Sequence, residues 1–216
     1  MAQDEEPSSP GPQISFSGEV PSPDRRSEPR QISILRVGKI FAGGRQALCR
    51  IRNISSRGLM AESPLPHAPG DEVKLELQSM APIPGEIIWS RDRYIGVRFD
   101  EPVDLDRVLA SRTPEGLPVR PPRIELAARA RLRCGADYFQ APLLNLSQGG
   151  ARVECDCPQC IGRGIVMTVD GLGTIEGTVR WVEDGYAGIA FNERLGFDRL
   201  TAWLVARMEA SGGEAA

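Results

Sequence analysis

The chain has 216 residues, which is long enough for one large domain or two small ones. Its hydrophobic fraction of 41% is typical of a soluble globular protein, and its net charge of −3 argues against a polyelectrolyte built to bind nucleic acid. Because no apolar run approaches the roughly 18 residues that cross a bilayer, we expect no membrane insertion.

The cysteines and the start of the chain indicate the redox environment. Five cysteines cannot all pair within one chain, and residues 1–12 are acidic and lack the apolar core of a signal peptide. We therefore expect reduced thiols and a cytoplasmic protein.

Positive charge is carried almost wholly by arginine. Lys39 and Lys74 are the lysines of the chain, against a total of 26 lysines and arginines. Arginine suits bidentate contacts with phosphate and guanine. The same bias also follows from a GC-rich coding sequence, so composition leaves both explanations open.

Both ends of the chain are predicted to be disordered. Residues 1–23 are rich in proline, serine, glycine and acidic side chains, and bury too little apolar surface to offset the entropy of ordering the backbone. Residues 211–216 are expected to form a second, shorter disordered tail.

From Gln31 the sequence alternates with period two, which is typical of antiparallel strands with one buried and one solvated face. Gly43-Gly44, Pro69-Gly70 and Asp92 are predicted turns. About six strands result, and a short helix is predicted from Leu105 to Ser111. The alternation predicts buried faces at Ala47, Cys49 and Ile51, at Val73, Leu75 and Leu77, and at Ile95, Val97 and Phe99, with Leu48, Arg50 and Arg52 on a wet face.

The same pattern then repeats at a fixed distance. The segment from Gly85 to Phe99, with Trp89 at its centre, matches Gly177 to Phe191 with Trp181 at its centre, an offset of 92 residues. The offset also carries Asn53-x-Ser55-x-x-Gly58 onto Asn145-x-Ser147-x-x-Gly150. A constant offset over widely spaced features indicates a tandem duplication. A longer closing helix is predicted for the second repeat, with Phe197, Leu200, Leu204 and Met208 on one face.

These elements predict a mainly β protein with two tandem six-stranded antiparallel β-barrels, each followed by a C-terminal α-helix. A sheet of this size with alternating faces hides its edges most simply by closing into a barrel. The predicted domains are residues 24–112 and 123–210, joined by a Pro- and Gly-rich linker at residues 113–122.

Two sequence features mark a candidate anion site in the first repeat. The first is an arginine-rich arm, Asp24-Arg25-Arg26-Ser27-Glu28-Pro29-Arg30, which contains an RxxxR spacing. The second is the NxSxxG turn of Asn53, Ser55 and Gly58, whose Asn and Ser can also simply hydrogen-bond nearby backbone while Gly supplies a positive φ. A further RxxxR pair, Arg129 and Arg133, falls within a strand pattern and is expected on its solvated face.

RxxxR before the first strand, followed by NxSxxG after the second, resembles the PilZ domain family, the bacterial receptors for cyclic di-GMP. The resemblance implies a barrel that binds this nucleotide without catalysis and needs no cofactor. It also implies ligand binding by the N-terminal arm, and we hypothesise that this arm is disordered when free and ordered when bound. The implied ligand-binding residues are Arg25, Arg26, Arg30, Asn53, Ser55 and Gly58.

The second repeat departs from the family pattern. Aligning Pro122-Arg123 with Pro29-Arg30 places Val119 opposite Arg26, with Arg120 one position out of register. A one-residue slip turns a side chain to the opposite side of an extended segment. We therefore interpret this repeat as a degenerate domain used for dimerisation, as in a homodimer, or for contact with a partner protein.

Four of the five cysteines fall in the second repeat. Cys155, Cys157 and Cys160 form a close group, and together with Cys134 they are a weak candidate for a zinc site of four thiolates. The alternative is a loop of ordinary reduced thiols with no metal. His67, the single histidine, lies in a Pro-rich segment and suggests no role.

Other function classes fit less well. One histidine and the lack of a catalytic cluster argue against an enzyme. Acidic residues on the wet strand faces argue against a barrel for polymeric single-stranded nucleic acid. The remaining alternative is a tandem barrel that binds only protein. For a receptor with no output domain, signalling must pass through an effector protein, in motility, exopolysaccharide synthesis or a related process.

Overall fold

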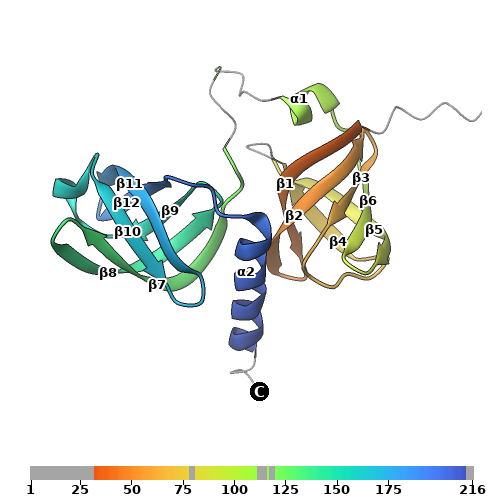
Figure 1. Cartoon of the computed structure of the whole chain (residues 1–216). Coiled ribbons are helices and arrows are strands. Elements are labelled where there is room, and N and C mark those ends of the chain that lie inside the picture. The colour runs from red at the N-terminus through yellow and green to blue at the C-terminus, as the bar shows by residue number, and fades with distance from the viewer. Residues whose placement is uncertain (1–31, 78–80, 111–115, 117–119, 213–216) are drawn as a thin grey trace, which may run out of the picture.

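The protein is described here by a computed structural model over residues 32–77, 81–110, 116 and 120–212. Within these residues it forms two closed antiparallel barrels, each of six strands (Figure 1). The first contains β1 (Ile32–Ala42), β2 (Arg45–Ser55), β3 (Gly58–Glu62), β4 (Glu72–Glu76), β5 (Ile83–Arg91) and β6 (Tyr94–Phe99), and is followed by α1 (Leu105–Leu109). The second contains β7 (Ile124–Cys134), β8 (Asp137–Ser147), β9 (Gly150–Glu154), the 3₁₀ turn η2 (Pro158–Cys160), β10 (Gly164–Val169), β11 (Gly173–Glu183) and β12 (Tyr186–Phe191), and is followed by α2 (Phe197–Gly212).

The two barrels have the same topology, which confirms the fold predicted from the duplication. The strand orders are β1-β2-β3-β6-β5-β4 and β7-β8-β9-β12-β11-β10, with β4 pairing back onto β1 and β10 onto β7. The irregularities also repeat at the same offset: the register shifts just before Trp89 in β5 and just before Trp181 in β11. The duplication therefore preserves local bends as well as strand order.

The first barrel encloses an apolar core that matches most of the predicted alternation. The three predicted buried faces are buried, and Leu75 and Cys49 are fully enclosed. Helix α1 covers this core with Val108 buried and Leu105 and Leu109 packed beside it, as predicted. The turns at Gly43-Gly44 and Asp92 adopt positive φ. Period-two alternation thus identified the inside of this barrel correctly.

Arg36 fastens the short helix to the barrel. It lies at the β1 register shift, and its guanidinium donates to the carbonyls of Val108, Leu109 and Ala110 at 3.2, 2.5 and 3.1 Å. The last carbonyls of a helix lack partners within the helix, and a cation there also offsets the negative end of its dipole. At the other end Asp104 caps α1 by accepting from the amides of Asp106 and Arg107. A five-residue helix therefore depends on Arg36 and Asp104 for its backbone partners.

Helix α2 is shared between the two barrels. Figure 1 shows it between them, and its buried residues Phe197, Leu200 and Leu204 belong to the core of the second barrel, as predicted. Its first turn also contacts β2 of the first barrel. The closing helix of the second repeat is therefore also part of the contact between domains.

One residue on β2 contradicts the predicted alternation. Leu48 was expected on a wet face but is 1% exposed and packs with the core of the second barrel. Val37, on the neighbouring strand, packs against the same core. The outer face of β1 and β2 is apolar at these two positions because a second domain covers it.

Polar contacts surround this apolar contact. Arg50 Nη2 lies 3.2 Å from Asp198 Oδ1, and its guanidinium stacks over the Phe197 ring at 4.3 Å. Lys39 donates to the Arg123 carbonyl at 3.0 Å, and Gln46 donates to the Glu125 carbonyl at 2.7 Å. Apolar contacts provide most of the stabilisation in such an interface, while directional contacts fix its orientation.

Candidate functional site

The sequence-predicted site residues fall in two segments of the chain, the arginine arm and the NxSxxG turn. Arg25, Arg26 and Arg30 lie outside the described residues. Asn53, Ser55 and Gly58 are described, at the end of β2 and the start of β3. The site is therefore built from the turn and from the surface beside it.

Ser55 holds the turn together from within. Its hydroxyl donates to the Gly58 carbonyl at 3.2 Å and accepts from the Arg57 amide at 3.4 Å. Ser147 makes the same pair of bonds, to the Gly150 carbonyl and from the Gly149 amide. The serine of the motif therefore has a structural role in both repeats, which accounts for its presence with or without a ligand.

The motif glycine is required for a different reason from the one predicted. Neither Gly58 nor Gly150 has a positive φ, so that expectation was wrong. A Cβ on Gly58 would stand 2.3 Å from the Val97 carbonyl oxygen of β6, and one on Gly150 would stand 2.4 Å from the Ile189 carbonyl oxygen. The glycine lets β3 lie against its neighbouring strand.

Gly58→Ala is expected to destabilise the first barrel, at the upper end of the roughly 1–3 kcal/mol typical of overpacking, because backbone atoms cannot move aside as a side chain can. Thermal and denaturant melts measure the loss. Gly164→Ala is the matched control, since a Cβ there meets nothing within 4 Å. Equal stability of the two variants would contradict the steric explanation.

Beside the turn the first barrel carries an open cleft of about 730 Å³. Such a volume lies within the roughly 300–1,000 Å³ of typical small-molecule sites. Trp89 is 38% exposed in its wall, with the indole lying over Gly96, where a Cβ would come within 2.0 Å of Nε1. Gly96 therefore leaves room for the indole to lie against β6, and part of the indole remains exposed. The cleft is lined by Asn53, Ile54, Ser55, Arg57, Gly58, Leu59, Met60, Ile88, Trp89, Gly96, Val97, Arg98, Phe99 and Asp100.

Three further cleft residues were not identified from the sequence. Arg57 is exposed within the motif itself, and Arg98 stands across from Gly58 in the strand register. Arg98 donates to Glu86 at 2.6 Å, a solvent-exposed ion pair. The signal for Trp89 was available, because the Trp and the Gly seven residues later occur together in both repeats. Its exposure could be learned only from the structure.

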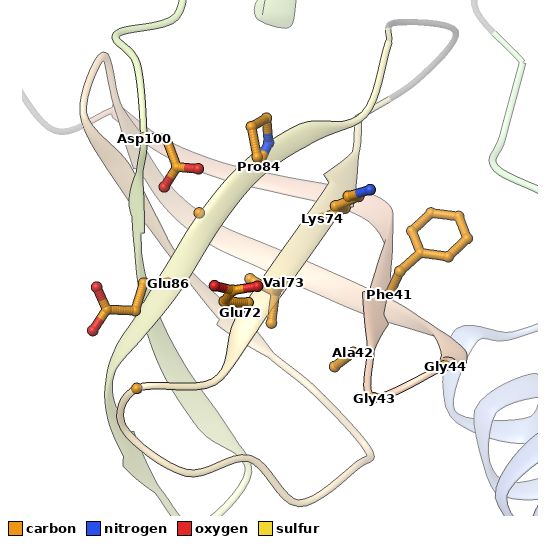
Figure 2. A pocket seen from close by; sticks show the side chains of 12 residues that line it. Phe41, Ala42, Gly43, Gly44, Glu72, Val73, Lys74, Pro84, Glu86 and Asp100 are labelled. Carbon is orange, nitrogen blue, oxygen red and sulfur yellow. The ribbon is translucent and has the colours of Figure 1, made fainter.

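A second cleft, of about 520 Å³, lies beside the first on the same barrel, and Asp100 lines both. Figure 2 shows Glu72, Glu86 and Asp100 in its lining, with Lys74 as the one cationic side chain among the residues that form it. Three carboxylates beside one ammonium repel a multiply charged anion. The cleft beside the NxSxxG turn is lined by Arg57 and Arg98 with one carboxylate, Asp100, and is therefore the better match to an anionic ligand.

The equivalent corner of the second barrel is filled by its own side chains. Asn145 is 7% exposed, accepts from Arg123 Nη1 at 2.8 Å, and donates to Glu125 at 3.4 Å. Burial lowers the pKa of Arg123, and the nearby charges of Arg120 and Arg152 act in the same direction. The strand pairs Ile32–Ile54 and Ile124–Leu146 keep the offset of 92 residues, so the alignment of Arg123 with Arg30, which requires 93, was wrong by one position. Arg123 therefore serves Asn145 as an internal partner.

The cysteines of the second barrel come together in its core. Cys134, Cys155, Cys157 and Cys160 are all buried and unpaired, in one apolar cluster. Across the described ranges, no group of three or more His, Cys, Asp or Glu side chains has the geometry to hold a metal ion. Burial raises the pKa of Cys157 and of Cys160 to about 12, so these thiols are protonated at neutral pH.

His67 belongs to a local network in the first barrel. Its Nε2 lies 2.9 Å from the Ser63 hydroxyl, and burial lowers its pKa. Among the helices in the described part of the chain, none has the length and apolar character needed to cross a membrane.

Comparison with protein families decides the identity of the fold. A family model described as "PilZ domain" matches residues 24–111 and, separately, residues 119–203. The chain belongs to the PilZ domain family. It carries two PilZ domains in tandem, which confirms the resemblance drawn from the arginine arm and the NxSxxG turn.

Three solved structures illustrate the similar proteins. The PlzA protein of Borreliella burgdorferi in complex with c-di-GMP is 14% identical, with a TM-score of 0.35 over 80% of this chain and 91% of that one. The MrkH–c-di-GMP complex of K. pneumonia is 11% identical, with a TM-score of 0.34 over 84% and 90%. YcgR of Escherichia coli in complex with c-di-GMP is 14% identical, with a TM-score of 0.31 over 82% and 85%. No curated protein sequence matched the chain.

Proposed function

We propose that this tandem PilZ protein is a cytoplasmic bacterial receptor for cyclic di-GMP that acts through an effector protein and catalyses no reaction. The nucleotide is held by Arg25, Arg26 and Arg30 of the arm, and by the Asn53–Gly58 turn of the first barrel. The observation that carries the proposal is the open cleft beside this turn, in a PilZ domain whose sequence retains both family motifs.

The chemistry of the ligand matches the groups at this cleft. Cyclic di-GMP carries two phosphate charges and two guanines, and an arginine fork pairs with a phosphate or with the O6/N7 edge of guanine. Arg57 and Arg98 add two further guanidiniums to those of the arm. The exposed part of the Trp89 indole offers a surface on which a guanine can stack, a contact worth about 1–3 kcal/mol per base.

An energetic comparison explains why the arm alone is insufficient. Ordering a backbone costs about 1–2 kcal/mol per residue, so a seven-residue arm offsets much of what three arginines gain. A dissociation constant of 1 μM corresponds to a net binding free energy of about −8 kcal/mol. Trp89 and Arg98 supply contacts that need little further backbone ordering because β5 and β6 already hold them, and Arg57 is held in the short turn between β2 and β3.

The second barrel contributes no equivalent site in this proposal. Its Asn145 is already bonded to Arg123 and Glu125, so a nucleotide would have to displace internal partners. We propose instead that this domain serves dimerisation or contact with a partner protein. Isothermal titration of the full chain with cyclic di-GMP is expected to saturate at one site per chain. Saturation at two sites would overturn the assignment of the second barrel, and no binding would favour a module that binds only protein.

Trp89→Ala is expected to weaken cyclic di-GMP binding by about 5- to 150-fold, the equivalent of losing about 1–3 kcal/mol of stacking. Trp181→Ala is the matched control, because Trp181 lies over Gly188 at the equivalent position of the second barrel. Calorimetric titration of both variants measures the difference. Equal affinities in the two variants would remove Trp89 from the site.

A further inference from the structure

The four cysteines of the second barrel come from separate segments that meet at one end of the barrel. Cys134 is the last residue of β7, while Cys155, Cys157 and Cys160 follow β9 in the loop that leads to β10. Hydrogen bonds from Gly162 N to Val179 O and from Val179 N to Arg163 O attach this loop to β11. The fold thereby brings Cys134 into one group with three cysteines that lie 21 or more positions further along the chain.

The thiols interact with one another as a chain of neighbours. Cys160 interacts with the thiols of both Cys134 and Cys157, and Cys157 interacts in turn with Cys155. Cys134, Cys157 and Cys160 are fully enclosed, and Cys155 is 9% exposed. Cys157 and Cys160 also flank a tight 3₁₀ turn, closed by a bond from Cys160 N to Cys157 O at 2.9 Å. A Cys-x-x-Cys turn facing further cysteines is the usual framework of a structural zinc site.

The first barrel shows what this end of the fold requires without the cysteines. At the offset of 92 residues their counterparts are Ala42, Ser63, Leu65 and Ala68. That barrel closes the same end with the Ser63 hydroxyl accepting from the Leu65 amide and bonded to His67. The first barrel therefore forms this end of the fold with ordinary small or apolar residues at the four positions. Four cysteines at all four positions of the other repeat indicate one joint role.

Thiol chemistry does not explain the group. A nucleophilic or redox-active cysteine is at least partly exposed to solvent, whereas these four are buried. Buried thiols also serve as small apolar core residues, as Cys49 does alone in the first barrel. The second barrel differs from the case of Cys49, because four cysteines cluster at one place and two of them have Cys-x-x-Cys spacing.

We infer that Cys134, Cys155, Cys157 and Cys160 form a structural zinc site that closes one end of the second barrel. In the described structure the thiols are neighbours without metal-holding geometry. Coordination at about 2.3 Å from one ion requires the thiols to lose their protons and to turn toward a common centre by rotation about χ1. The ion then joins β7 to the loop after β9, whereas in the first barrel the Ser63 hydroxyl bonds lie within the corresponding loop.

Metal analysis of the full chain tests this inference. The chain is produced in zinc-containing medium and purified under reducing conditions without chelator, and we expect one zinc ion per chain. Replacement by cobalt(II) is expected to give the sulfur-to-cobalt charge-transfer band and the visible bands of a tetrahedral thiolate site. Removing the metal is expected to lower the melting temperature of the second barrel.

Cys157→Ser is expected to lose the zinc, whereas Cys49→Ser, which changes the buried cysteine outside the group, is expected to keep it. If Cys157→Ser fails to fold, the metal content and cobalt spectrum of the unaltered chain decide. An unaltered chain without bound zinc and without cobalt–thiolate bands would overturn the inference, as would full zinc retention by folded Cys157→Ser. Metal content and the cobalt spectrum are measured without cyclic di-GMP, so their outcome tests the zinc site independently of the proposed receptor function.

Discussion

Arg30→Ala is expected to abolish detectable binding of cyclic di-GMP while the thermal melt without ligand stays unchanged. In the proposed binding mode Arg30 contacts the ligand, and its place in the sequence is before the first strand, Ile32–Ala42, whose residues form the barrel. Loss of a hydrogen bond to a charged group costs about 1.5–3 kcal/mol, and the ordering cost of the arm is then no longer offset. Calorimetric titration and melts of the two proteins measure both effects. Arg26→Ala is expected to behave in the same way.

Arg129→Ala is the matched control for the arm. Arg129 and Arg133 have the same RxxxR spacing, and both are exposed on β7, as the sequence predicted. Removing Arg129 is expected to leave nucleotide affinity and stability unchanged, because solvated strand arginines contribute little. An Arg30→Ala protein that binds like Arg129→Ala would exclude the arm from the site.

Leu48→Ala is expected to destabilise the docked arrangement of the two barrels by about 2–5 kcal/mol, the usual range for removing a buried leucine side chain. Leu48 is 1% exposed although it lies on the outside of its own barrel, because the core of the second barrel covers it. Melts of the full chain measure the loss of stability. Small-angle scattering measures any separation of the barrels as an increase in radius of gyration.

The duplication supplies a control for this change. Gln140 occupies the position of Leu48 in the second barrel and is exposed. Gln140→Ala is expected to change neither the melt nor the scattering. If Leu48→Ala were equally silent, the contact between the barrels would contribute no stability in solution.

The interior of each barrel was accessible from sequence because it follows a local rule. Alternation with period two places Val73, Leu75 and Leu77 on one face of a strand whatever lies nearby. The offset from Trp89 to Trp181 required only comparison of the chain with itself. Strand number, closure and the tandem arrangement were therefore predicted correctly. The arm remains a prediction, since Arg25, Arg26 and Arg30 lie outside the described residues.

The candidate site was less accessible, because its surroundings come from distant strands. The turn residues were identified from their motif, but the reason for Gly58 lies in a carbonyl of β6, 39 residues further along the chain. The exposure of Trp89 and the position of Arg98 beside the turn depend on how β5 and β6 pair with β3. Strand register was needed to place these side chains.

By itself, the sequence determined two duplicated barrels, the identity of the turn and the difference between the repeats, because side-chain alternation and internal repetition are properties of the chain alone. Only the tertiary structure decided which outer face is covered, which cleft has suitable charge, and which cysteines meet. Leu48 shows the reason: its burial is a contact with residues more than 70 positions away, and no local pattern encodes it.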